Sequence, residues 1–212
     1  MTQYGFFQNA DICIGCRTCI ISCKDKNDLP IGEKYRRVYD YAGCSWDVAS
    51  NNSVKPKDYF SYSVSTACNH CASPLCFASC PTNAIEKRSD GIVIIDYDLC
   101  IGCGACVTAC PFGVPYMSKE LNVARKCDFC YDLIDKGEVP YCVAACSARA
   151  LDWGDIDALK AKYPGTVQTL PPITDDLSTN PSILYMPNRL NPDGKLAGVI
   201  LNEPEELASE AI

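Results

Sequence analysis

The chain has 212 residues, seventeen of them cysteine, and a formal net charge of −7. Such an acidic composition argues against nucleic acid as a partner. No run approaches the roughly 18 apolar residues of a transmembrane helix, and residues 1–7 carry neither a signal peptide nor a twin-arginine motif. We therefore expect a chain that is soluble alone, with bound metal contributing to its folding stability because much of its apolar content is cysteine.

The N-terminal part combines a predicted strand with a cysteine quartet. Residues 4–12 form a short apolar run, which is typical of a strand. The run leads into Cys13-x2-Cys16-x2-Cys19-x3-Cys23. Residues 24–67 follow as an insertion rich in Asp, Asn, Lys and Tyr. Its aromatic side chains are expected to cover a core, with a partner-facing surface as the alternative: Tyr35, Tyr39, Tyr41, Trp46, Tyr59, Phe60 and Tyr62.

Three further quartets follow, and each of them also ends in C-x3-C. They are Cys68-x2-Cys71-x4-Cys76-x3-Cys80-Pro81, Cys100-x2-Cys103-x2-Cys106-x3-Cys110-Pro111 and Cys127-x2-Cys130-x11-Cys142-x3-Cys146. The four quartets use sixteen of the seventeen cysteines. Cys44 remains, and we interpret it as a spare thiol.

The third quartet is the bacterial run for [4Fe–4S] clusters. Its first three thiols lie on one short loop and can hold three corners of one cluster, whereas the fourth ligates a second cluster. Gly102 and Gly104 allow the tight turn, and Pro111 ends the helical turn. Sixteen thiolates match four such clusters. Zinc ribbons and disulfide scaffolds are less favoured alternatives, because the former use separated C-x2-C pairs and the latter suit short secreted chains.

The other predicted elements repeat a strand, cluster loop, helix, strand order. Residues 92–95 form a strand after a turn at 89–91, and residues 84–85 and 148–151 lead into strands. Residues 155–162 can form a short helix. From Pro164 the sequence is rich in proline, with apolar segments at 183–186 and 196–201. We expect an extended arm with little core of its own, ordered against a partner chain; a disordered tail is the alternative.

The predicted fold class is α+β, with two units that each resemble a bacterial ferredoxin carrying two [4Fe–4S] clusters. One unit comprises residues 1–60 and 120–160, with quartets one and four and the insertion 24–67. The second unit, residues 61–119, carries quartets two and three and is inserted in the first. Residues 161–212 form the extended C-terminal arm for subunit contact.

Read in order, the quartets and several smaller motifs identify a family. The motifs are Gln3-Tyr4-Gly5-Phe6-Phe7, Arg36-Arg37-Val38-Tyr39, Tyr41-Ala42-Gly43, Cys68-Asn69-His70-Cys71, Cys100-Ile101-Gly102-Cys103, Lys126-Cys127-Asp128 and Arg149-Ala150-Leu151-Asp152. Residues 1–155 resemble the iron–sulfur (beta) subunit of the dimethyl sulfoxide reductase family of molybdopterin oxidoreductases, and most closely its dimethyl sulfoxide reductase members. Ser147 departs from the pattern, since relatives often have proline there.

The resemblance implies a heterotrimer of anaerobic respiration. In it, a molybdenum bis-pterin catalytic subunit and a hydrophobic, quinone-reactive membrane anchor exchange electrons through this subunit, which catalyses nothing by itself. The subunit would be peripheral on the cytoplasmic membrane, on the extracytoplasmic face after co-export with the catalytic subunit. A free-standing polyferredoxin carrier is the alternative, and a regulatory cluster sensor a third. The substrate and the direction of electron flow stay open.

The resemblance also assigns ligands. Cluster one, nearest the catalytic subunit, has Cys13, Cys16, Cys19 and Cys146; cluster two has Cys127, Cys130, Cys142 and Cys23; cluster three has Cys68, Cys71, Cys76 and Cys110; cluster four, nearest the anchor, has Cys100, Cys103, Cys106 and Cys80. Nitrate reductase relatives have tryptophan at the position of Cys103 and a [3Fe–4S] cluster there. The candidate residues for tuning cluster potentials are Arg17, Lys24, His70, Arg125 and Lys126.

Overall fold

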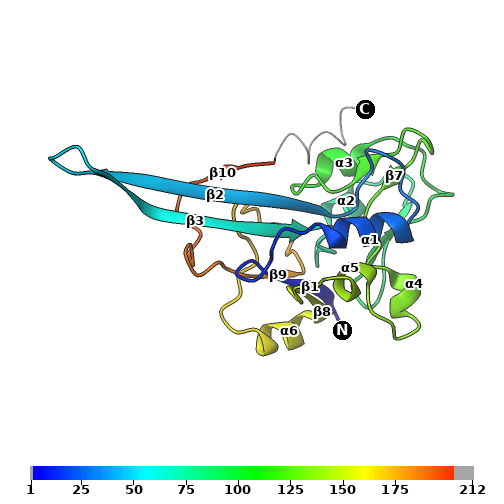
Figure 1. Ribbon diagram of the computed structural model, residues 1–212. Coiled ribbons are helices and arrows are strands. Elements are labelled where there is room, and N and C mark those ends of the chain that lie inside the picture. The colour runs from blue at the N-terminus through cyan, green and yellow to red at the C-terminus, as the bar shows by residue number, and fades with distance from the viewer. Residues whose placement is uncertain (1, 203–212) are drawn as a thin grey trace.

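The computed structural model describes residues 2–202, and strands from distant parts of this range meet in one central sheet. The strand order is β8 (Leu151–Asp155), β1 (Tyr4–Asn9) and β9 (Ile183–Met186). β1 is antiparallel to β8 and parallel to β9 (Figure 1). The predicted strand at residues 4–12 is therefore confirmed as the middle strand of the sheet.

Both faces of β1 are covered, which explains why the consecutive residues Phe6 and Phe7 are both apolar rather than alternating with polar residues. Phe6 lies in the main core, stacked on Phe129 with ring centroids 4.1 Å apart. Phe7 faces the other way and packs with Leu184 and with α6 (Ile156–Lys162). The predicted helix at 155–162 is confirmed as α6, and its N-terminus is capped by Asp155, whose side chain accepts two backbone N–H groups.

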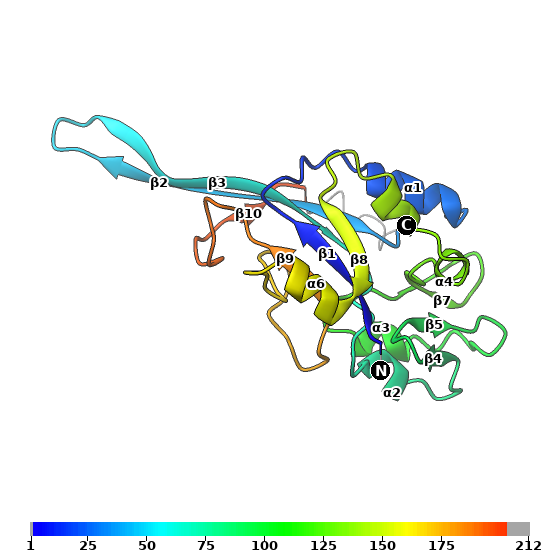
Figure 2. The ribbon, with the colours of Figure 1, turned by 90° about the horizontal axis from the view of Figure 1, so that it is seen from below.

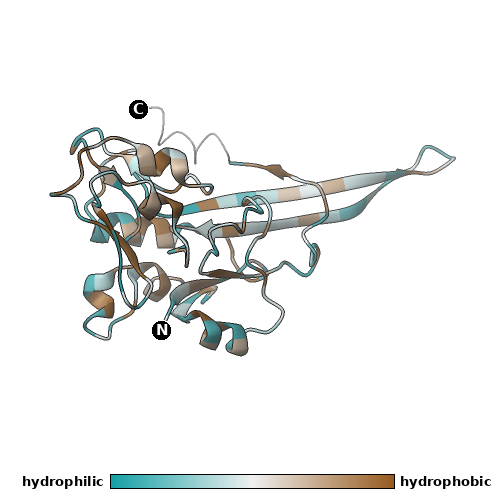
Figure 3. Ribbon diagram, turned by 180° about the vertical axis from the view of Figure 1, so that it is seen from behind, coloured by the Kyte–Doolittle hydropathy of each residue, from teal (hydrophilic) through white to brown (hydrophobic). Residues whose placement is uncertain are grey.

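A long hairpin projects from the body of the molecule (Figures 1 and 2). β2 (Arg37–Val48) pairs antiparallel with β3 (Val54–Thr66), and β10 (Val199–Ile200) pairs with β2 on its other edge. Side chains are buried at the base of the hairpin and exposed toward its tip. Figure 3 shows hydrophilic and hydrophobic positions mixed along both strands.

The aromatic residues of the predicted insertion fall into two groups, buried and exposed, according to their position along the hairpin. The prediction of a core role is confirmed for four buried side chains, Tyr35, Tyr41, Phe60 and Tyr62. It is wrong for Trp46 and Tyr59, which are 62% and 61% exposed. Tyr39 is half-buried. Distance from the body explains the difference, because within residues 2–202 no second layer covers the outer part of the hairpin.

The cysteine quartets lie in a region of short elements beside the central sheet. α1 (Thr18–Lys26) follows the first cysteine loop, and the predicted strands at 84–85 and 92–95 are confirmed as a two-stranded hairpin. The other short elements, in chain order, are α2 (Leu75–Ala78), β4 (Ile85–Lys87), β5 (Val93–Ile95), α3 (Ala105–Ala109), β6 (Tyr116–Met117), β7 (Ala124–Arg125), α4 (Tyr131–Ile134) and α5 (Tyr141–Ala144).

The C-terminal segment differs from its prediction. Residues 164–202 contribute β9 and β10 to two sheets of their own chain. Leu170, Ile183, Leu184 and Tyr185 are fully buried. The expectation that this segment has little core of its own is therefore wrong for its described part; residues 203–212 of the predicted arm lie outside the described residues. Within residues 2–202, none of the helices combines the length and apolarity needed to cross a membrane.

Candidate metal centres

Cysteines from different quartets meet around three hollows. The hollows are lined by Cys13, Cys16, Cys19 and Cys146, by Cys68, Cys71, Cys76 and Cys110, and by Cys80, Cys100, Cys103 and Cys106. These groups match the predicted ligands of clusters one, three and four, and we name them sets one, three and four. The empty space in the hollows, open mouth included, is about 340, 380 and 320 Å³ in the same order. Because the three hollows are similar in size, each of them suits the same kind of bound group.

The thiols predicted for cluster two form set two, namely Cys23, Cys127, Cys130 and Cys142. All four are buried. Burial raises the pKa of Cys23 to about 12, and the thiolates of Cys142 and Cys130 add to the increase. Burial also raises the pKa of Cys127, and the Cys23 thiolate makes the next largest contribution to the increase. The mutual electrostatic effects indicate that these four thiols are neighbours.

Each C-x3-C pair sends its two thiols to different sets. Cys19 and Cys23 lie one turn apart on α1, so both project from the same face of the helix. Cys19 lines the hollow of set one, whereas Cys23 belongs to set two. Cys106 and Cys110 are divided in the same way between sets four and three. The short helices after the cysteine loops therefore link neighbouring sets mechanically.

The four sets differ in their exposure to solvent. Cys16 of set one and Cys103 of set four are exposed, whereas every thiol of set two is buried and those of set three are buried or half-buried. The isoleucines beside the two exposed thiols are also uncovered: Ile14 is 70% exposed and Ile101 is 67% exposed. Sets one and four are thus surface sites, and sets two and three are interior sites.

Comparison with known proteins indicates that the chain binds 4Fe-4S clusters. A 4Fe-4S binding domain matches residues 10–29, and a 4Fe-4S dicluster domain matches residues 59–156. Over 205 residues the chain is 42% identical to the B subunit of anaerobic dimethyl sulfoxide reductase of Escherichia coli (strain K12), with 96% of this chain and 98% of the relative covered. The chain belongs to the iron–sulfur subunits of the dimethyl sulfoxide reductase family.

Two further relatives place the chain within a family that includes other reductases. The thiosulfate reductase electron transfer subunit of Salmonella typhi is 38% identical, with 73% of this chain and 77% of the relative covered. The B subunit of polysulfide reductase of Wolinella succinogenes is 30% identical, with 88% and 95% covered. The resemblance inferred from the motifs is confirmed.

Two cations of this family member are buried beside the thiols. Lys126, one of the predicted tuning residues, is 2% exposed and lines the hollow of set three. Arg36 is 1% exposed and was not predicted as a tuning residue. Burial opposes the charge of the Arg36 guanidinium, but the thiolates of Cys142, Cys19 and other cysteines outweigh it and raise the pKa. The pKa of Lys126 is likewise raised, because nearby thiolates outweigh the effect of burial.

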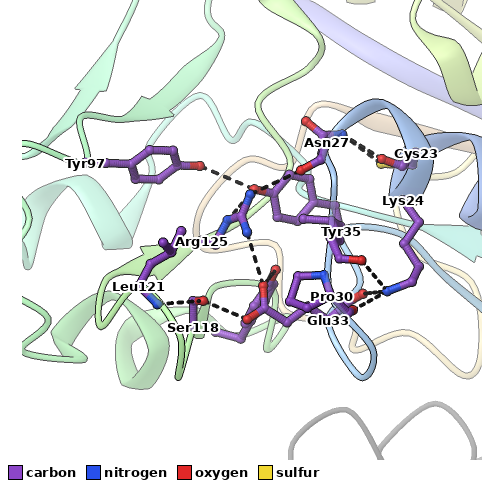
Figure 4. A network of polar contacts seen from close by, with 12 residues as sticks. Cys23, Lys24, Asn27, Pro30, Glu33, Tyr35, Tyr97, Ser118, Leu121 and Arg125 are labelled. Carbon is purple, nitrogen blue, oxygen red and sulfur yellow. Dashed lines mark hydrogen bonds and ion pairs between the residues drawn. The ribbon is translucent and has the colours of Figure 1, made fainter.

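The remaining predicted tuning residues have other contacts. Lys24 donates to the backbone oxygens of Leu29, Pro30 and Glu33, so it fixes the loop after α1 (Figure 4). Arg125 pairs with Glu33 at 3.3 Å and donates to the carbonyl of Asn27.

Asn27 joins this network to a ligand set. Its side chain donates to Cys23 Sγ at 3.6 Å, so the contacts in Figure 4 reach set two only through it. Of the last two predicted tuning residues, Arg17 lines the hollow of set one and forms an ion pair with Asp40. His70 Nδ1 accepts a hydrogen bond from the backbone N–H of Val93, burial lowers its pKa, and its buried Nε2 has no hydrogen-bond partner within residues 2–202.

The surroundings of the thiols fit the clusters that the matched domains bind. Backbone N–H groups point at sulfur: Ala150 donates to Cys146 Sγ at 3.2 Å and Ala124 to Cys100 Sγ at 3.5 Å. Several buried side chains keep polar atoms without a hydrogen-bond partner among the described residues, and those of Arg36, Asn69 and His70 include N–H donors. Cluster sulfur is a suitable acceptor for such donors. The cysteine thiols, the N–H groups directed at sulfur, the apolar hollows and the buried cations therefore suit [4Fe–4S] clusters.

Gly102 and Gly104 provide a matched test of the loop in set four. Both have positive φ, +69° and +73°, but a Cβ at Gly102 would overlap the carbonyl oxygen of Asn122, whereas one at Gly104 meets nothing within 4 Å. We expect Gly104→Ala to cost about 1–2 kcal/mol through backbone strain alone. Gly102→Ala should cost roughly 1–3 kcal/mol more through overpacking, and should lose iron from set four. Thermal unfolding and iron content of anaerobically purified variants test this; equal losses in both would contradict it.

Proposed function

We propose that the chain is the electron-transfer subunit of a membrane-associated molybdopterin oxidoreductase and holds four [4Fe–4S] clusters on its sixteen quartet cysteines. Sets one to four are the proposed ligands of clusters one to four. The clusters supply one-electron transfer. The chain's own residues hold them, keep water away from the interior pair and leave the outer pair near partner surfaces. Its partners would be a molybdenum bis-pterin catalytic subunit and a quinone-reactive membrane anchor.

The graded exposure of the four sets supports this proposal most directly. A relay needs two ends that partners can approach and an interior that solvent cannot reach, because electron tunnelling falls steeply with distance. Cys16 and Cys103 are exposed, while set two is wholly buried. Exposed apolar residues, Ile14 at one end and Ile101 at the other, suit burial against other subunits. The repeated Cys-Ile-Gly-Cys motif thus lies at both proposed ends.

The proposed architecture is one ferredoxin-like unit inserted in another. The pairing of β1 with β8 and the packing of α1 against α5 support it, because these contacts join the parts of the chain that carry quartets one and four. The proposed inner unit carries quartets two and three. Exposed apolar residues of the C-terminal segment, such as Leu177 and Leu190, support a further role of that segment in subunit contact.

Copurification with other subunits would distinguish the proposed electron-transfer subunit from a free-standing polyferredoxin. The relatives include proteins named as the B component of a reductase, which is a name for one part of a complex. We expect the protein, isolated from native cells by an affinity tag, to carry a large molybdenum-containing subunit with it. Recovery of the protein alone, with all its iron, would favour the carrier. The relatives act with dimethyl sulfoxide, thiosulfate or polysulfide reductases, so the copurifying subunit also identifies the substrate class.

Metal content gives the first test of the four proposed clusters. Protein purified without oxygen should contain about sixteen iron and sixteen sulfide per chain, with no stoichiometric zinc. The expectation follows from four sets of four thiols. Iron and acid-labile sulfide assays, with zinc measured on the same sample, decide it. Iron sufficient for only two clusters, or one zinc per chain, would contradict the proposed ligand sets.

A further inference from the structure

Two buried cations lie where neighbouring ligand sets approach one another. Arg36 is 1% exposed and Lys126 is 2% exposed. A buried positive charge is costly unless negative charge lies close to it. The groups that raise the pKa of Arg36 most strongly are thiolates of two different sets, Cys142 and Cys127 from set two and Cys19 from set one. Contacts of the Arg36 side chain lead toward both of these sets.

Contacts on one side join Arg36 to set one. Its Nη1 donates to Ser65 Oγ at 3.2 Å, and Ser65 Oγ lies 3.4 Å from Cys19 Sγ. Ser65 also lines the hollow of set one. Through this hydroxyl the guanidinium is held at the wall of the first hollow.

Contacts on the other side join Arg36 to set two. The guanidinium lies over the ring of Phe6, 5.0 Å from its centroid, and Phe6 stacks on Phe129. The backbone N–H of Phe129 donates to Cys127 Sγ at 3.4 Å. Arg36 Nη2 is fully buried and has no hydrogen-bond partner within residues 2–202. One donor of the guanidinium thus stays available to a bound group.

Lys126 occupies the corresponding place one set further along. It lines the hollow of set three together with Cys68 and Cys76. Its Nζ donates to the carbonyl oxygens of Val93 and of Cys127, which belongs to set two. The lining of the hollow of set four, as far as the structure describes it, includes no Lys or Arg. Arg36 therefore lies near sets one and two, and Lys126 lies near sets two and three. Neither cation lines the hollow of set four.

We propose that Arg36 and Lys126 are positioning residues that raise the reduction potentials of clusters in overlapping pairs, Arg36 for clusters one and two and Lys126 for clusters two and three. The inference rests on the proposed function. A one-electron reduction adds one negative charge beside the fixed cation. The cation stabilises the reduced form more than the oxidised form, so the potential rises. Removing the cation lowers the potential of both clusters that it serves.

The test uses Arg36→Met and Lys126→Met in the full chain, because methionine keeps an apolar stem without the charge. The clusters are titrated with redox mediators and followed by paramagnetic resonance. We expect two of the four midpoints to fall in each variant. At fixed potential the ratio of reduced to oxidised cluster should drop about tenfold, as Coulomb's law at an effective dielectric of about 20 suggests; for a one-electron couple this corresponds to about 59 mV. One cluster should shift in both variants and one in neither.

Three further variants separate charge from packing. Arg36→Lys and Lys126→Arg retain the charge and should bring the midpoints back toward the wild-type values. Arg88→Met is the control, because Arg88 pairs with Asp90 and Asp135 rather than with thiolates; all four midpoints should stay in place. If Arg36→Met loses iron, Lys126→Met must still shift two clusters and leave two unchanged.

Several results would overturn the inference. They are unshifted midpoints in both methionine variants, the same two clusters shifting in both, equal shifts in the charge-retaining variants, or loss of iron in both methionine variants. Wild-type protein with fewer than four clusters would instead refute the proposed function. The wild-type titration therefore separates failure of the proposed function from failure of the inference.

Discussion

Replacing Cys103 with serine is expected to remove most quinol-driven turnover of the assembled complex and to leave dye-driven turnover nearly unchanged. Cys103 lines the hollow of set four and is exposed, at the proposed quinone end of the relay. Three thiols of the set remain and can hold three irons, so a [3Fe–4S] cluster should replace the cubane. Loss of one thiolate and the change of cluster type raise the potential, so electrons from quinol are held there. A dye that reduces the molybdenum end directly does not need this site.

Paramagnetic resonance of the oxidised variant checks the expected change of cluster, and the two turnover assays check its effect. Cys44→Ser is the matched control, because Cys44 is also exposed but belongs to none of the four sets. It should keep all iron and both activities. If Cys103→Ser shows no [3Fe–4S] signal and keeps its quinol-driven turnover, Cys103 is no ligand of the terminal cluster and the proposed order is wrong.

Deleting residues 164–212 is expected to prevent the chain from accumulating as folded, cluster-loaded protein. The deletion removes β9, which pairs with the middle strand β1, and so exposes Phe7 on one face of the sheet. It also removes Thr179 from the wall of the hollow of set three. Soluble yield and iron content of the truncated chain, produced without oxygen, measure the effect. A truncated chain with a full complement of iron would show that the C-terminal segment is dispensable for the fold.

Two single leucine substitutions test the packing of the C-terminal segment without shortening the chain. Leu184 is 2% exposed and packs in one cluster with Phe7 and with Ile156 and Leu159 of α6, whereas Leu190 is 46% exposed. We expect Leu184→Ala to lower the free energy of unfolding by about 2–5 kcal/mol and Leu190→Ala by less than about 0.5 kcal/mol. Denaturant unfolding under anaerobic conditions compares them. Equal effects would contradict the assignment of β9 to the core.

Much of the candidate site could be predicted because cysteine spacing is a local signal. The strand before Cys13, the helical turn between Cys19 and Cys23, and the strand after Cys80 all lie within a few residues of a ligand. Covalent geometry and metal chemistry decide such short stretches with little help from the rest of the fold. The quartets therefore predicted sets of neighbouring thiols that the structure brings together.

Arg36 could not be identified in the same way. It is adjacent to Arg37, and the two side chains point to opposite sides of an extended backbone. One is fully buried, whereas the other donates to Gly113 near the surface. Nothing in the local sequence distinguishes them, because burial is decided by Phe6 and Ser65, which come from distant strands.

The C-terminal segment was misjudged for a related reason. Its strands are short, and their partners β1 and β2 lie near the other end of the chain. A four-residue strand between prolines has no periodic pattern long enough to detect. Its stability comes from the strand it joins, so the sequence of the segment alone looks like an arm.

The position of β1 sets an order of events during synthesis. It leaves the ribosome before the other described strands, yet its two neighbours are β8 and β9, which are made more than 140 residues later. Set one likewise needs Cys146 to complete the group begun at Cys13. The nascent β1 must therefore wait, with Phe6 and Phe7 uncovered, until β9 at Ile183–Met186 has been translated. Such a chain gains from chaperone protection, and the first ligand set can be filled completely only after Cys146 has emerged.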